Sequence, residues 1–282
     1  MNYTPRYLGR GSWLSRRDPR LLVLTVVCFV FTAVQVWDVR ILLGLAVVAA
    51  VYYRSAGIPF RAVRRQWAFV TFFVLMLVLV NGVIAGGRVP RLPDDQLHVY
   101  LHLPVIGTPV SAESLMYALA QLIRFLAMAA VRFPLAFAMH PADFGVTFAR
   151  LGIPDRFAFA IDLTFRFVPS LAADLQTTID AQRVRGMELD KGAGGILGRM
   201  RRQAPILVPT VVNAIVGAED TIDAMDLRGF GTGPRSWLRD LVFDRTDRLV
   251  VGLLFGMLAI ATVAGFMTTS ADVWVPDLIL PR

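Results

Sequence analysis

The sequence predicts an all-α polytopic membrane protein with about five transmembrane helices and a cytoplasmic helical domain inserted before the last span. The first observation behind this class is composition. Of 282 residues, 56% are hydrophobic and only 18% are charged, and the mean hydropathy of +0.58 lies outside the usual range of soluble proteins. The second is a set of long uncharged runs. The third is a charged segment, 140–248, that separates the last two of these runs.

Five apolar runs are the predicted spans, at 21–37, 41–53, 67–85, 114–139 and 249–267. The second is short, about 20 Å of helix at 1.5 Å per residue. Only Asp38-Val39-Arg40 separates it from the first run, so the two are predicted to form a helical hairpin. The predicted organisation is therefore an amino-terminal membrane region, a cytoplasmic domain, and a last span with its tail. Their ranges are 1–139, 140–247 and 248–282.

Arginines cluster in two segments, the first twenty residues and the connection between the second and third runs. They are Arg6, Arg10, Arg16, Arg17 and Arg20, followed by Arg54, Arg61, Arg64 and Arg65. Because such segments stay in the cytoplasm, we expect a multi-pass protein of the plasma (inner) membrane with its amino terminus inside and its carboxyl terminus outside. No small-residue cleavage site follows the first run, so that run is predicted to be a retained span rather than a signal peptide.

The remaining composition excludes several classes. The net charge of +8 comes almost wholly from arginine, since Lys191 is the only lysine, and cytoplasmic arginines explain it better than nucleic-acid binding does. Cys28 is the only cysteine, which excludes a disulfide framework and cysteine-based metal sites. In 86–112, predicted to lie outside, residues 97–103 alternate and indicate a small β-hairpin. His98 and His102 could form a metal pair, but a strand is the better interpretation and a third ligand is missing.

The segment 140–248 is too charged for a span and too apolar for a free loop, so amphipathic helices at the cytoplasmic interface are predicted. It contains one pattern twice. Residues 178–186 read Thr-Ile-Asp-Ala-Gln-Arg-Val-Arg-Gly, and 221–229 read Thr-Ile-Asp-Ala-Met-Asp-Leu-Arg-Gly. Each copy resembles a helix that ends with a cation in its last turn and glycine after it. Taken singly, each arginine could serve only its own helix dipole; the repetition favours a partner with two equivalent sites.

Four other charges have structural interpretations. Arg124 and Arg132 fall in the fourth span, where a central arginine costs roughly 2.5–3.5 kcal/mol on insertion scales. Arg132 is expected to extend to the cytoplasmic interface, and Arg124 to be either a packing tie or a contact to the cytoplasmic domain. Asp162 and Arg166 are four residues apart, which predicts an intrahelical ion pair.

Catalytic motifs are not evident. The phosphate-binding pattern Gly-x-x-x-x-Gly-Lys-Ser/Thr is missing, because Lys191 follows Asp190, so energy must come from a partner. A self-contained secondary transporter would carry ionisable residues at the bilayer midplane and inverted repeats of spans. A membrane-embedded enzyme would cluster His, Asp or Glu at the interface. Both remain as less favoured alternatives.

Several motifs together resemble the transmembrane T component of energy-coupling factor (ECF) transporters, the EcfT/CbiQ family, over almost the whole chain. They are Asp18-Pro19-Arg20, Ser111-Ala112-Glu113-Ser114-Leu115, Leu163-Thr164-Phe165-Arg166-Phe167-Val168-Pro169, Ala181-Gln182-Arg183-Val184-Arg185-Gly186, and the second Arg-Gly copy between Ala224-Met225 and Phe230-Gly231. In the first motif, Asp can cap a helix and Pro suits its first turn.

The resemblance implies that two coupling helices end in arginine-centred tripeptides, each docking in a groove on one of two ABC-type ATPase subunits. These are Val184-Arg185-Gly186 and Leu227-Arg228-Gly229, with Gln182, Arg183 and Asp226 as supporting residues. The family's usual first residue is Ala, so Val184 and Leu227 are bulkier departures.

The resemblance further implies a non-catalytic subunit of an ATP-driven importer of a micronutrient, a vitamin or a transition-metal ion. ATP and Mg would be bound by the partner ATPases and no cofactor or metal by this chain. A membrane-embedded S component would hold the substrate.

Overall fold

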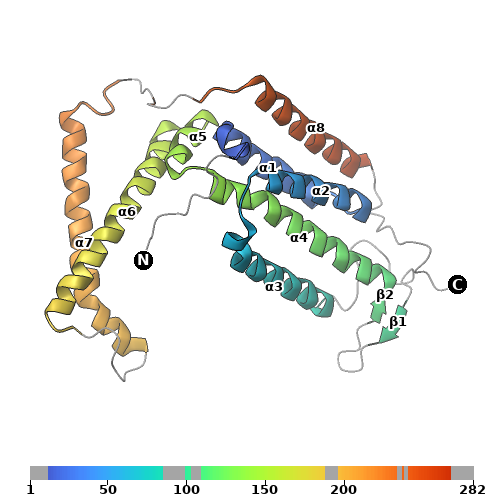
Figure 1. Cartoon of the computed structure of the whole chain (residues 1–282), viewed down its shortest axis with the longest axis horizontal. Helices are drawn as coiled ribbons and strands as arrows, with labels where there is room; N and C mark the ends of the chain where they lie inside the picture. Colours follow the sequence, from blue (N-terminus) through green and yellow to red (C-terminus); the bar gives the residue numbers. More distant parts are fainter. Residues whose placement is uncertain are drawn as a thin grey trace. The chain divides into compact units, whose positions relative to one another are not determined.

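Helices account for most of the described structure (Figure 1). The computed structural model describes residues 12–84, 99–102, 109–187, 196–233, 237 and 241–267. The elements are η1 (Leu14–Arg16), α1 (Pro19–Gln35), α2 (Val39–Ser55), α3 (Phe60–Ile84), β1 (Val99–His102), β2 (Pro109–Ser111), α4 (Ala112–Ala138), η3 (Pro141–Asp143), α5 (Phe144–Arg150), α6 (Asp155–Val184), α7 (Ile196–Leu227) and α8 (Arg245–Met267).

The chain divides into two compact units. One, which we call the bundle, consists of 6–140 and 241–282. The other, which we call the paired-helix unit, consists of 141–240, together with residues 1–5, which lie outside the described residues. The chain thus leaves the bundle after His140 and re-enters it at Leu241.

Two aspartates start the first two helices of the bundle. The carboxylate of Asp18 accepts a hydrogen bond from the backbone N–H of Arg20, and Pro19 occupies the first turn of α1. Asp38 accepts in the same way from the N–H of Arg40 at the start of α2. Each carboxylate satisfies a backbone donor that a helix leaves without an intrahelical partner. The predicted cap at Asp18 is confirmed.

Helix α4 is the centre of the bundle, since α1, α2 and α3 all pack against it (Figure 1). Its buried side chains join those of α1 and α2 in a core that includes Phe29, Leu42 and Val131. The short break predicted between α1 and α2 is present, but the two helices do not pack mainly against each other: α2 packs against α4, and α1 packs against α8 and α4. The two helices are therefore held by α4 and α8 rather than as a self-contained hairpin.

Arg124 is the buried cation of this core. Its side chain donates to the carbonyl of Val36 at 2.5 Å and to Oε1 of Gln121 at 2.9 Å, and its guanidinium lies 5.0 Å from the ring centre of Trp37. Val36 ends α1, so Arg124 supplies a donor to a helix end inside the bundle. Of the two predicted roles, the structure shows the packing tie. Arg132 is exposed.

Four helices are long and apolar enough to cross a membrane: 60–81, 114–138, 204–227 and 245–266, with 19–35 as a shorter apolar helix. This agrees with an all-α polytopic membrane protein, and each predicted span coincides with a helix. The segment 204–227 was not predicted as a span. It is uncharged and largely apolar through Ala218, whereas Glu219, Asp220, Asp223 and Asp226 make its last third acidic.

The predicted hairpin is also present. Strand β1 pairs antiparallel with β2, with His102 opposite Pro109 and an irregularity between Val99 and Leu101. His98 and the turn 103–108 lie outside the described residues.

In the paired-helix unit, α5 packs closely against α6. A Cβ added at Gly145 would lie 2.6 Å from Cβ of Asp162 and 2.9 Å from the carbonyl oxygen of Ala158. The ring of Phe144 stacks on Phe165 with centres 4.8 Å apart. The predicted ion pair between Asp162 and Arg166 is wrong: among the described residues these two side chains are not paired. Asp162 faces α5, and an exposed pair at this spacing would add only about 0.2–0.5 kcal/mol.

Candidate docking site at two helix ends

The first copy of the repeat forms the carboxyl end of α6. The N–H of Met187 bonds to the carbonyl of Gln182 at 3.0 Å, and the N–H of Gly186 bonds to that of Arg183 at 3.0 Å. Gly186 has φ of 86°, in the left-handed region that glycine adopts without steric cost. This pair of bonds is the Schellman motif, which satisfies the last carbonyls of a helix. Arg185 is therefore held at the point where the chain turns away.

The second copy forms the end of α7 in the same way. The N–H of Phe230 bonds to the carbonyl of Met225 at 3.0 Å, the N–H of Gly229 bonds to that of Asp226 at 2.9 Å, and φ of Gly229 is 67°. The matching threonines also agree, since the hydroxyls of Thr178 and Thr221 each donate to the carbonyl four residues earlier. The repeat in sequence is thus a repeat in backbone geometry.

Both ends expose an apolar side chain next to an arginine. Val184 and Leu227 are each 90% exposed, and Arg185 and Arg228 are exposed as well. Neither guanidinium makes an ion pair with any residue that the structure describes. Each end therefore offers an aliphatic group and up to five N–H donors to whatever approaches it.

Gln182 joins the end of α6 to α7. Pro209 has no N–H, so the carbonyl of Pro205, four residues earlier in α7, lacks its helical donor. The side-chain amide of Gln182 donates to that carbonyl at 3.3 Å. Gln182, predicted as a supporting residue, thus connects α6 to α7. The sequence alone did not reveal that Pro209 leaves a carbonyl for it to bind.

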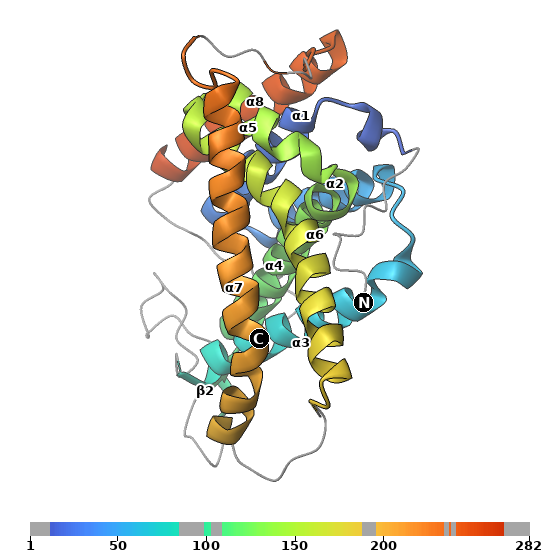
Figure 2. The ribbon, with the colours of Figure 1, turned by 90° about the vertical axis from the view of Figure 1, so that its left-hand side faces the viewer.

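The two tripeptides lie at opposite ends of this helix pair. Gln182 meets α7 near its beginning, at Pro205, whereas Phe230 beyond the end of α7 packs on Phe159 near the start of α6, with ring centres 4.7 Å apart. The helices therefore run antiparallel, as Figures 1 and 2 show. With a rise of 1.5 Å per residue, the two arginines are on the order of 35 Å apart.

The remaining supporting residues make the two ends different in charge. Arg183 pairs with Asp180 at 3.3 Å, and both side chains are more than half exposed. The second copy has Asp223 and Asp226 at the corresponding positions, both exposed. The first end carries two guanidiniums and one carboxylate, the second one guanidinium and two carboxylates.

Within the described residues, no group of three or more His, Cys, Asp or Glu side chains is placed to hold a metal ion. The two helix ends themselves offer exposed N–H donors and aliphatic groups, which suit recognition of another surface.

Comparison with known proteins places these features in a family. The family model described as cobalt transport protein, CbiQ, matches residues 10–237, a range that contains both helix ends. The chain is 28% identical over 261 residues to the energy-coupling factor transporter transmembrane protein EcfT of Lactococcus lactis subsp. cremoris, covering 87% of this chain and 91% of the relative. It is 25% identical to the proteins of the same name from Acidaminococcus fermentans, with 93% and 95% covered, and Thermotoga maritima, with 90% and 91% covered.

Proposed function

The chain belongs to the CbiQ cobalt transport protein family, and from this premise we propose that it is the transmembrane coupling subunit of an ATP-driven ECF-type importer. It links two ABC-type ATPase subunits to a membrane-embedded S component that binds the substrate. The substrate class is a micronutrient, either a vitamin or a transition-metal ion. The chain is the non-catalytic subunit: it binds no cofactor, and the partner ATPases bind and hydrolyse ATP with Mg.

The observation that carries this proposal is the pair of equivalent helix ends. Each docks in a groove of one ATPase subunit, with Arg185 or Arg228 donating to a carboxylate. A guanidinium can pair with a carboxylate through two parallel hydrogen bonds, and truncating such a buried interfacial pair costs about 2–5 kcal/mol. Two such anchors, on the order of 35 Å apart by helix rise, suit a partner with two grooves.

The exposed aliphatic side chains support docking over a purely local role. An arginine that only complements its helix dipole adds about 0.3–1 kcal/mol and needs no apolar neighbour in water. Val184 and Leu227 are 90% exposed at equivalent positions, and full burial of each would contribute about 1.5–3 kcal/mol. We therefore propose that both enter the apolar part of a groove. The bulk that distinguishes them from the family's usual Ala then increases the buried area.

The proposed mechanism uses the rigidity of the antiparallel pair. ATP-driven closure of the two ATPase subunits moves the two helix ends relative to each other, and α6 and α7 carry this movement toward the membrane. The exposed apolar faces of the spans, for example around Phe69 and Phe72 of α3, hold lipid and the S component. In this account the chain is a multi-pass protein of the inner membrane whose amino terminus and docking ends are cytoplasmic and whose carboxyl terminus is outside.

The test is capture of the ATPase pair, expressed from the same source, by detergent-purified chain. Wild type is compared with Arg185→Ala, Arg228→Ala and the double variant. Arg166→Ala is the matched control, since Arg166 is an exposed arginine of α6 outside the repeat. We expect weaker capture by each single variant, none by the double variant, and wild-type capture by the control. Equal capture by all five proteins, or by none, would remove the docking assignment.

A further inference from the structure

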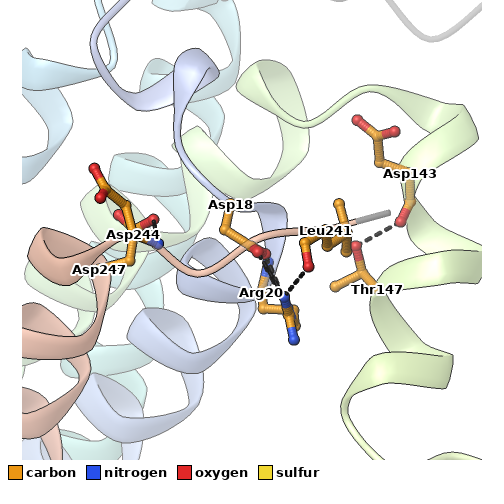
Figure 3. A network of polar contacts seen from close by, with 7 residues as sticks. All are labelled: Asp18, Arg20, Asp143, Thr147, Leu241, Asp244 and Asp247. Atoms are coloured by element: carbon orange, nitrogen blue, oxygen red, sulfur yellow. Dashed lines mark hydrogen bonds and ion pairs between the residues drawn. The ribbon is translucent and has the colours of Figure 1, made fainter. Parts of the chain in front are cut away.

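Side chains at the start of α1 bind residues 241–247, the segment through which the chain re-enters the bundle. The carboxylate of Asp18, with 1% of its side chain exposed, pairs with the guanidinium of Arg20, which is 12% exposed. Nη2 of Arg20 lies 2.8 Å from Oδ2 of Asp18, and Nε lies 3.1 Å from Oδ1. The same Nη2 donates to the carbonyl of Leu241 at 2.8 Å, as Figure 3 shows. Arg20 therefore joins Asp18 to the first residue of the returning chain.

Arg20 and Arg17 make further contacts with the same segment. The guanidinium of Arg20 lies over the ring of Phe243, 4.2 Å from its centre. Nη1 of Arg17 pairs with Asp244 at 3.1 Å and lies 3.7 Å from Oδ1 of Asp247, whose side chain is 2% exposed. Asp247 also accepts from the N–H of Asp244 and so closes the first turn of α8. Two arginines thus hold 241–247 through a carbonyl, a ring and two carboxylates.

A helix cap alone does not need these contacts. The same Asp-x-Arg cap starts α2, where Asp38 accepts from the N–H of Arg40. At α1, Arg20 forms a two-point ion pair with Asp18 and a hydrogen bond to a residue 221 positions away. The returning segment lies between the paired-helix unit, which ends at Asp240, and α8, which starts at Arg245. Any movement passed along the chain into α8 must go through it.

We propose that Asp18, Arg20 and Arg17 form a clamp that passes movement of the paired-helix unit to the α1–α8 pair. These are positioning residues, because they act by holding Leu241 to Asp247 rigidly against α1. Without the clamp, the segment would absorb the movement and α8 would stay still. This inference rests on the proposed coupling function and adds where the movement enters the bundle.

The test follows amide hydrogen exchange in the chain bound to its two ATPase subunits in nanodiscs, with and without MgATP and orthovanadate. The test variant is Asp18→Asn with Arg20→Gln. It keeps a good capping residue but loses the ion pair. The matched control is Asp38→Asn with Arg40→Gln at the equivalent cap. Arg20→Lys is the second variant, because lysine keeps the charge without the planar fork, and it decides the question if the double variant does not fold.

In wild type we expect nucleotide binding to change the rate of amide exchange at the two helix ends, 181–187 and 225–231, and also in 241–255. In the test variant the helix ends respond as before, while the response of 241–255 falls at least about fivefold, the lower end of usual coupling between sites. Arg20→Lys gives an intermediate response, and the control responds as wild type. A purely structural role would lower thermal stability and leave the response intact.

An unchanged response of 241–255 in the test variant and in Arg20→Lys would overturn the clamp while the docking proposal stands. An equal loss in the control would overturn it too, since the effect would not be specific to the clamp. If the helix ends of wild type show no nucleotide response, the coupling function fails and the clamp fails with it.

Discussion

Replacing Gly145 by alanine should loosen α5 from α6. The added Cβ would lie 2.6 Å from Cβ of Asp162 and 2.9 Å from the carbonyl oxygen of Ala158, whereas carbon atoms prefer about 3.5–4.0 Å. The helices must therefore separate by about 1 Å. Because one obstacle is backbone, a rotamer change cannot relieve the contact. Overpacking of this kind costs about 1–3 kcal/mol.

The assay is amide exchange in α5, where this cost corresponds to exchange about 5- to 150-fold faster. Gly217→Ala is the matched control, because Gly217 is helical with nothing within 4 Å of an added Cβ. Alanine there should stabilise α7 by about 0.5–1 kcal/mol. Exchange in α5 that is unchanged or slower in Gly145→Ala would refute the close packing of the two helices.

Three further predictions concern single contacts. Gln182→Ala leaves the carbonyl of Pro205 without its side-chain donor. We therefore expect amide exchange to show that α7 around Pro205 loses about 0.5–1.5 kcal/mol of local stability. The control is Gln176→Ala at an exposed glutamine of α6, which should leave exchange in that region unchanged. Gly186→Ala and Gly229→Ala place a Cβ at positive φ, so each should cost about 1–2 kcal/mol and speed exchange at the N–H of Met187 or Phe230; equal rates would contradict the Schellman ends. Arg124→Met removes the donor to the carbonyl of Val36, which should cost about 1–3 kcal/mol of folding stability. We expect a lower midpoint of thermal unfolding, followed by tryptophan fluorescence. The control Arg132→Met, at an exposed position, should have the wild-type midpoint within experimental error.

Local patterns in the sequence predicted much of the fold. Asp18 is followed by Pro19 and an apolar run, and it caps α1 as predicted. The alternation before Gly107 and Pro109 indicated a hairpin, and two paired strands are present there. These features depend on residues close together in the chain, so the spacing of apolar, turn and capping residues carries the information.

The helix ends of the candidate site were predicted for the same reason. An arginine followed by glycine specifies a Schellman end locally, and both ends have this geometry. That they dock on ATPase subunits remains a proposal. Arg183 in the first copy and Asp226 in the second occupy the same position of the repeat. Because both helix ends have the same backbone geometry, the sign of the charge at this position does not determine that geometry.

Contacts between distant segments were not predictable. Arg17 meets Asp244 across 227 positions, and no spacing rule connects them. Gln182 could be recognised as a donor to Pro205 only after α6 and α7 were known to be antiparallel. The ion pair of Asp162 with Arg166 is the opposite case, in which a spacing rule was outweighed by close packing at Gly145. The acidic last third of α7 likewise concealed a helix that is long and apolar enough overall to be a candidate span.

Site-specific crosslinking shows whether both helix ends contact ATPase subunits in one complex. Cysteines carrying a photocrosslinker would replace Val184 and Leu227, singly and together, in a Cys28→Ser background that removes the only native thiol. Val212, exposed on α7, is the control position. We expect one ATPase subunit linked to each single variant, two linked to the double variant, and none to the control. Crosslinks no more frequent at Val184 and Leu227 than at Val212 would contradict the docking proposal.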